Sequence, residues 1–145
     1  MTGDAKLDSP TVYEGFAGLW IESNYASQTP QSERREQAAW IVQSASGYTL
    51  VPILNASAGP CSIAVYETPP PGAVSMVHTH PFRLGETTTT CTGYGAVCTG
   101  TPSTDDRAAL SRFGFSTGYI LDASGIGRYT ATGGESAQRE TRCGY

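Results

Sequence analysis

The sequence predicts an α+β domain in which helices flank a mixed, mainly antiparallel sheet. Apolar side chains recur at helical spacing near the start of the chain, and short apolar runs typical of strands follow. A helix-start signal then precedes a second set of strand-like runs. Seventeen glycines and nine prolines supply the turns that antiparallel neighbours need. This order of helix, strands, helix and strands favours the α+β class.

The first predicted element is a helix from Pro10 to about residue 23. Proline is favoured in the first helical turn, and Thr11 with Glu14 has the form of a capping box. The buried face of this helix would consist of apolar residues at helical spacing, namely Val12, Phe16, Leu19 and Trp20. The polar residues 27–35 predict a loop after the helix.

Short apolar runs predict the first strands. Residues 38–42 and 48–53 are expected to form a hairpin around a turn at 44–47, and residues 61–66 to form a further strand. Three prolines and a glycine then interrupt the chain. Residues 73–78 follow as a buried strand that ends at the histidines.

The second half of the chain predicts a long loop, a short helix and another hairpin. Residues 82–102 show no periodicity, and loops of that length inside compact domains are often functional. A helix is predicted over residues 104–112, and strands over 117–121 and 126–130. The tail from residue 132 is polar and predicts no element.

Length, charge and hydropathy restrict the function classes. The 145 residues fit one domain, 1–145. A net charge of −4 argues against a nucleic-acid partner, because phosphate binding needs a basic surface. No apolar run approaches the roughly 20 residues that cross a bilayer, so no membrane span is expected. The first nine residues lack the apolar core of a signal peptide.

The four cysteines bear on the cellular compartment of the protein. None forms a C-x-x-C pair, so a structural zinc site of that kind is not expected. Cys91 and Cys98 bracket a short polar loop and suit a local disulfide, which leaves Cys61 to pair with Cys143. Two disulfides would indicate a secreted or extracytoplasmic protein. The alternative is four free thiols in a cytoplasmic one.

Both histidines of the chain, His78 and His80, lie in one H-T-H-P motif. Imidazoles two residues apart on an extended strand point to the same side and can reach one ion. A catalytic zinc site takes three protein ligands and leaves one position for water. Asp106, in the first turn of the predicted second helix, is the expected third ligand. Its neighbour Asp105 is the alternative, although it would point about 100° away around the helix.

Each half of this pattern has an ordinary structural explanation when taken alone. Ser103 and Asp106 form the S-x-x-D of a common helix cap, where an acid near the N-terminus is favoured anyway. Two histidines on a strand are also common. The conjunction of H-x-H-P with a following S-x-x-D, on elements of suitable type, is what predicts a zinc site.

H-x-H-P followed by S-x-x-D, with a glutamate upstream, resembles the signature of the JAB/MPN/JAMM zinc metalloproteases. The resemblance implies a curved mixed sheet flanked by helices, layered as in cytidine deaminases. It also implies that Zn²⁺ is held by His78, His80 and Asp106, and that Ser103 steadies the developing oxyanion. The family's general base is the upstream glutamate, for which Glu36 is the matching candidate because small and apolar residues follow it.

The choice of base and the spacing of the motif leave alternatives open. Glu22 and Glu67 are weaker candidates for the base, and Glu36 could be only a solvated charge among its charged neighbours. Ser103 lies 23 residues after His80, farther than in the family. Loop insertions cost little entropy, so this one need not break the site, and it could form a rim or lid over the metal.

The match is closest to the JAB-like domains at the C-terminal ends of bacterial polymorphic toxins, over about residues 10–130. Shared segments include a Gly-Tyr-Thr hairpin at 47–49 and a closing Gly-Tyr hairpin that begins at 118. The resemblance implies a secreted hydrolase that cleaves an amide bond, peptide or isopeptide, in a protein or peptide substrate. It further implies a cognate immunity or inhibitor protein. The alternatives are a non-catalytic binding module, a purely structural metal site, and an endopeptidase of the peptidoglycan or phage-tail type.

Overall fold

The fold is known from a computed structural model that describes residues 3–23, 30–60, 62–82, 102, 104–123, 125–132 and 136–139. In chain order the elements are α1 (Pro10–Glu22), the 3₁₀ turn η1 (Gln31–Glu33), β1 (Ala38–Ser44), β2 (Gly47–Pro52), β3 (Ala56–Ala58), β4 (Ile63–Val65), β5 (Ala73–Thr79), α2 (Thr104–Phe113), β6 (Gly118–Asp122), β7 (Gly125–Tyr129) and β8 (Ser136–Arg139). Neither helix in this part of the chain has the length and apolar character to cross a membrane.

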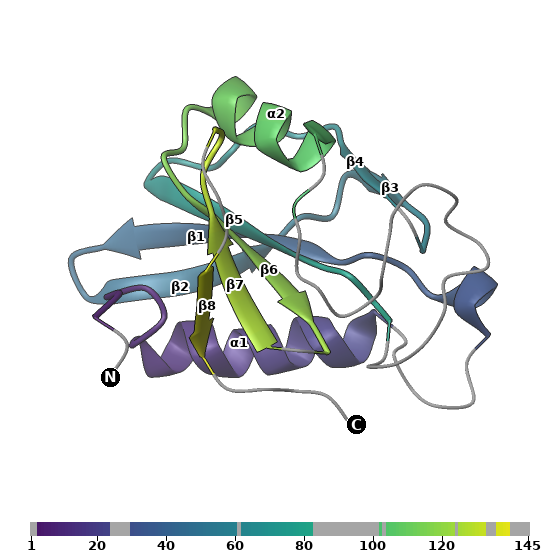
Figure 1. Ribbon diagram of the computed structural model, residues 1–145. Coiled ribbons are helices and arrows are strands. Elements are labelled where there is room, and N and C mark those ends of the chain that lie inside the picture. Colours follow the sequence, from purple (N-terminus) through teal and green to yellow (C-terminus); the bar gives the residue numbers. More distant parts are fainter. Residues whose placement is uncertain are drawn as a thin grey trace.

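Six strands form one sheet in the order β2-β1-β5-β6-β7-β8, and β3 and β4 form a separate two-stranded sheet. All neighbours in the large sheet are antiparallel except β5 and β6, which are parallel. Helix α1 lies along one face of the large sheet, and α2 lies on the opposite side (Figure 1). The predicted α+β class with a mixed, mainly antiparallel sheet is therefore confirmed.

Most predicted elements are present, with four differences. Strands β3 and β8 were not predicted, because their short sequences carry no apolar run and each depends on pairing with a neighbour. The strand expected at 61–66 is shorter, as β4. The loop expected at 27–35 contains η1. Helix α1 begins at Pro10 as expected, but the capping box of Thr11 and Glu14 is wrong, because the N-cap is Ser9, whose hydroxyl donates to the Tyr48 carbonyl.

The two faces of the sheet are covered by two apolar clusters. The face under α1 includes Phe16, Trp20, Ile41, Val77 and Tyr119. The face under α2 includes Trp40, Met76, Leu110, Ile120 and Tyr129. Successive side chains of a strand point to opposite faces, so Met76 and Val77 of β5 divide between the clusters. His78, two residues after Met76, therefore belongs to the α2 face.

Gly118 at the start of β6 permits close packing beneath α2. A Cβ on this residue would lie 2.8 Å from Leu110 Cδ2 and 2.9 Å from Tyr129 Cζ. Both distances are shorter than carbon atoms tolerate, so a larger residue here would force the Leu110 or Tyr129 side chain to move. Because β5 and β6 are parallel, the chain returns through α2 to the start of β6, and the start of α2 lies near the carboxyl end of β5, where Asp106 Oδ1 is 3.2 Å from His78 Nε2.

Candidate metal centre

His78 is held in the middle of the sheet. Its backbone pairs with Ala38 of β1 on one side and with Ile120 of β6 on the other. The residue is 2% exposed, and the ring of Tyr129 packs edge-on against it with centroids 6.1 Å apart. Strand pairing on both sides and ring packing leave this imidazole little freedom to move.

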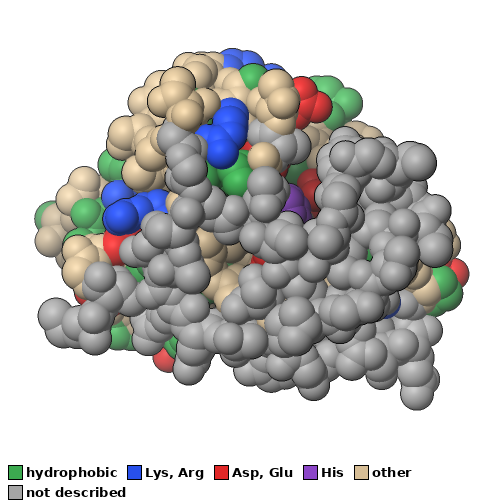
Figure 2. All heavy atoms as spheres, in the orientation of Figure 1, with side chains coloured by type: hydrophobic (Ala, Val, Ile, Leu, Met, Phe, Trp, Pro, Cys, Tyr) green, Lys and Arg blue, Asp and Glu red, His purple; other side chains and the backbone are tan. Residues whose placement is uncertain are grey.

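His80 lies just beyond the end of β5 and points to the same side as His78. Its backbone N–H donates to the Leu121 carbonyl at 2.8 Å, which holds the segment against β6 after β5 has ended. The Nε2 atoms of the two rings are 3.2 Å apart. The His80 side chain is 23% exposed. Histidine and acidic side chains are visible from outside below α2, so the group is reachable from this face (Figure 2).

Asp106 is the third residue of α2 and completes the group. Its Oδ1 lies 3.2 Å from Nε2 of His78, and its Oδ2 lies 3.7 Å from Nε2 of His80. The backbone N–H groups in the first turn of a helix have no partner within the helix and attract negative charge, so this position favours a carboxylate. Asp105, the alternative ligand, is exposed and is not part of the group.

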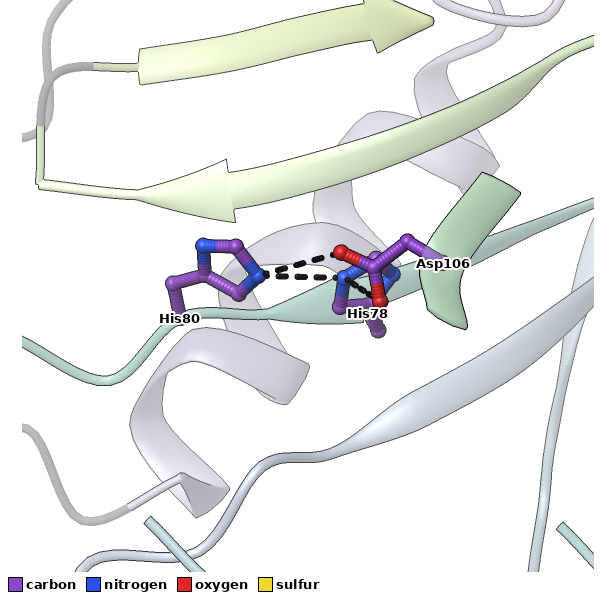
Figure 3. A group of neighbouring side chains, drawn as sticks. All are labelled: His78, His80 and Asp106. Atoms are coloured by element: carbon purple, nitrogen blue, oxygen red, sulfur yellow. Dashed lines mark hydrogen bonds and ion pairs between the residues drawn. The ribbon is translucent and has the colours of Figure 1, made fainter. Parts of the chain in front are cut away.

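Among the residues that the structure describes, His78, His80 and Asp106 form a group that could hold a metal ion (Figure 3). Tetrahedral zinc with bonds of about 2.0–2.1 Å places its ligand atoms roughly 3.3 Å apart. Two of the separations in this group are 3.2 Å and one is 3.7 Å. The donor set, two imidazoles and one carboxylate, is also one that zinc accepts.

The electrostatics of the group favour a bound cation. Burial alone would lower the pKa of His78, but the neighbouring Asp106 carboxylate outweighs it and raises that pKa to about 9. Burial would raise the pKa of Asp106, yet the two histidines hold it well below its usual range. At neutral pH Asp106 is thus a carboxylate, and without metal it is paired with the protonated imidazole of His78. A divalent cation can take the place of that proton.

Glu36 lies beside the group and precedes β1. Its carboxylate Oε1 is 3.9 Å from Nε2 of His80, and the residue is 5% exposed. Burial raises the pKa of Glu36 from 4.5 to about 8, against the opposing effect of His78 and with a smaller contribution from the charge of Asp106. The alternative that Glu36 is a solvated surface charge is therefore wrong, because the chain turns it inward toward the histidines.

The other candidate bases are placed elsewhere. Glu67 accepts hydrogen bonds from the Trp40 indole and from the Asn55 backbone, so its carboxylate holds the β3–β4 hairpin rather than the metal group. Glu22 is exposed at the last residue of α1. Ser103, the four cysteines and most of the predicted 82–102 loop lie outside the described residues.

Two residues that contact the site's framework were missed by the sequence reasoning. Tyr129 lies in the predicted strand at 126–130, but nothing in that pattern indicates contact with a histidine on a distant strand. Arg34 is 2% exposed although it sits in a run of charged residues, which ordinarily indicates a solvated segment. The only sequence signal for Arg34 is its closeness to Glu36.

Comparisons with known proteins found no family model, no curated protein and no solved structure that matches the chain. The case for a function therefore depends on the geometry of this group and on the motif that supplies it.

Proposed function

We propose that this chain is a zinc-dependent hydrolase of the JAMM type that cleaves an amide bond. The observation that supports it most is the convergence of His78, His80 and Asp106, with the buried Glu36 carboxylate 3.9 Å from the nearer imidazole. Three metal-binding side chains and one separate base are the set that metal-assisted hydrolysis requires.

Zinc bound by the three ligands would activate water and polarise a carbonyl. Glu36 accepts the proton of the attacking water and delivers it to the leaving amine. Burial raises the pKa of this carboxyl to about 8, and a nearby cation would draw it down toward neutrality, the range in which a general base works best. Ser103, by the family resemblance, donates its hydroxyl to the developing oxyanion; one such donor is commonly worth about 3–4 kcal/mol.

The substrate and the setting follow the same resemblance. We propose a protein or peptide substrate with a peptide or isopeptide bond, cleaved by a secreted toxin or effector domain that a cognate immunity protein restrains. The net charge of −4 fits a protein partner better than nucleic acid.

A cleavage assay tests the proposal. The zinc-loaded protein is incubated with a denatured protein, an isopeptide-linked peptide conjugate and cross-linked peptidoglycan, and newly formed amines are identified by mass spectrometry. We expect cleavage of at least one amide class by the wild type and loss of cleavage in Glu36→Gln with zinc retained. Equal cleavage by Glu36→Gln would assign the base to another residue. Tight zinc binding without cleavage of any class would favour a binding module.

A further inference from the structure

Hydrogen bonds join the segment that carries Glu36 to the segment that carries the histidines. Gln37, the next residue after Glu36, donates its backbone N–H to the Thr79 hydroxyl at 2.9 Å. Thr79 returns its own N–H to the Gln37 carbonyl, also at 2.9 Å. Thr79 stands between the two histidines and is fully buried. These two bonds therefore join the neighbour of the base to the residue that separates the ligands.

Arg34 adds a third connection from the other side of Glu36. Its Nη1 donates to the carbonyl of Pro81, the residue directly after His80, at 3.1 Å. The guanidinium carbon also lies 5.9 Å from the centre of the Phe82 ring, within range of a cation–π contact. Arginine is rarely buried this deeply unless the structure supplies acceptors. The buried guanidinium is thus hydrogen-bonded to the backbone of the residue directly after His80.

The neighbouring Arg35 shows the contrast. It is exposed, and within the described part of the chain its guanidinium donates to the carbonyls of Ser32 and Arg34 in its own segment. Arg35 thus makes no connection to the histidine segment through those bonds. It offers a matched control for the removal of one guanidinium from this region.

We infer that Arg34 and Thr79 are positioning residues that hold His80 and Glu36 in register across the metal group. This inference rests on the proposed function, because it assigns a role around the same metal. Both residues contact backbone, and the His80–Glu36 separation of 3.9 Å depends on where the two segments meet. Partners that orient metal ligands typically change metal affinity by roughly 10–100-fold when they are removed.

The test compares four variants with the wild type. Arg34→Met keeps the apolar stem and removes the donor, and Thr79→Val keeps the shape and removes the acceptor. Arg35→Met is the control for Arg34→Met, and Thr79→Ser is the control for Thr79→Val because it keeps the hydroxyl. Zinc affinity is measured by competition with a chromophoric chelator, and the visible spectrum of the Co²⁺-loaded protein reports ligand geometry. We expect Arg34→Met and Thr79→Val to bind zinc roughly 10–100-fold more weakly with altered Co²⁺ spectra. Arg35→Met and Thr79→Ser should resemble the wild type.

The outcomes separate this inference from the proposed function. Failure of the wild type to bind zinc refutes the metal site itself. If the wild type binds zinc and the folded Arg34→Met and Thr79→Val variants match it in affinity and spectrum, the positioning role is refuted. Should Arg34→Met not fold by circular dichroism, the Thr79→Val and Thr79→Ser pair decides alone, because only Thr79→Ser keeps the hydroxyl. Equal weakening by Thr79→Ser would then contradict the role of the hydrogen bond.

Discussion

Replacement of Glu36 by glutamine should stabilise the metal-free protein while removing its activity. In the folded chain burial raises the pKa of Glu36 to about 8, against 4.5 for an unperturbed carboxyl. Between these values the unfolded chain releases a proton that the folded chain keeps, so stability falls as pH rises through that window. The 3.5-unit difference corresponds to about 5 kcal/mol in full, and to about 3 kcal/mol at neutral pH. Glutamine resembles the protonated acid and avoids this cost.

Urea unfolding in the presence of a chelator measures the effect. The free energies of unfolding of the wild type and Glu36→Gln should nearly agree at about pH 5 and diverge as pH rises, with the variant more stable. The exposed Glu33 provides the control, and Glu33→Gln should show no such divergence. A Glu36→Gln variant that is equally stable or less stable at about pH 8 would refute the claim that a buried carboxyl faces the metal group.

The remaining predictions concern the ligands, the packing and the cysteines. His78→Ala or His80→Ala should abolish tight zinc binding, and a variant that still holds one equivalent would contradict the ligand assignment. Because the pKa of His78 is raised to about 9 in the metal-free protein, zinc must displace its proton. Affinity measured by calorimetry should therefore rise between pH 7 and pH 9, with proton release, and pH-independent binding would count against this pair. Gly118→Ala should destabilise the fold by about 1–3 kcal/mol in thermal unfolding, since its Cβ would press on Leu110 and Tyr129, and an unchanged midpoint would contradict this packing. Thiol titration of the denatured, unreduced protein should find no free cysteine, and four free thiols would end the disulfide prediction.

Elements with a strong local pattern could be predicted from the sequence. The α1 stripe and the apolar runs of β1, β5, β6 and β7 each appear near their expected bounds. Strands β3 and β8 could not be predicted, because an Ala-Ser-Ala segment and a polar segment become strands only through their partners. The start of α1 at Pro10 could also be predicted, whereas Thr11 and Glu14 have the form of a capping box although the N-cap is Ser9.

The candidate site likewise contains residues that could be predicted from the sequence and residues that could not. His78, His80 and Asp106 were predictable because metal ligation needs particular residue types at particular spacings, which a sequence displays. The burial of Glu36 and Arg34 was not, since charged neighbours look alike in sequence whether they face solvent or the interior. Inward placement of that segment comes from bonds to Gly59, Thr79 and Pro81, which belong to distant parts of the chain.

X-ray absorption at the zinc edge, on protein loaded with one equivalent, tests the metal centre most directly. We expect two imidazole nitrogens with oxygen ligands at about 2.0–2.1 Å and no sulfur. An Asp106→Asn sample should show weaker occupancy under the same conditions. Sulfur scattering at about 2.3 Å, or a wild-type protein that does not retain the metal, would contradict a zinc site built from His78, His80 and Asp106.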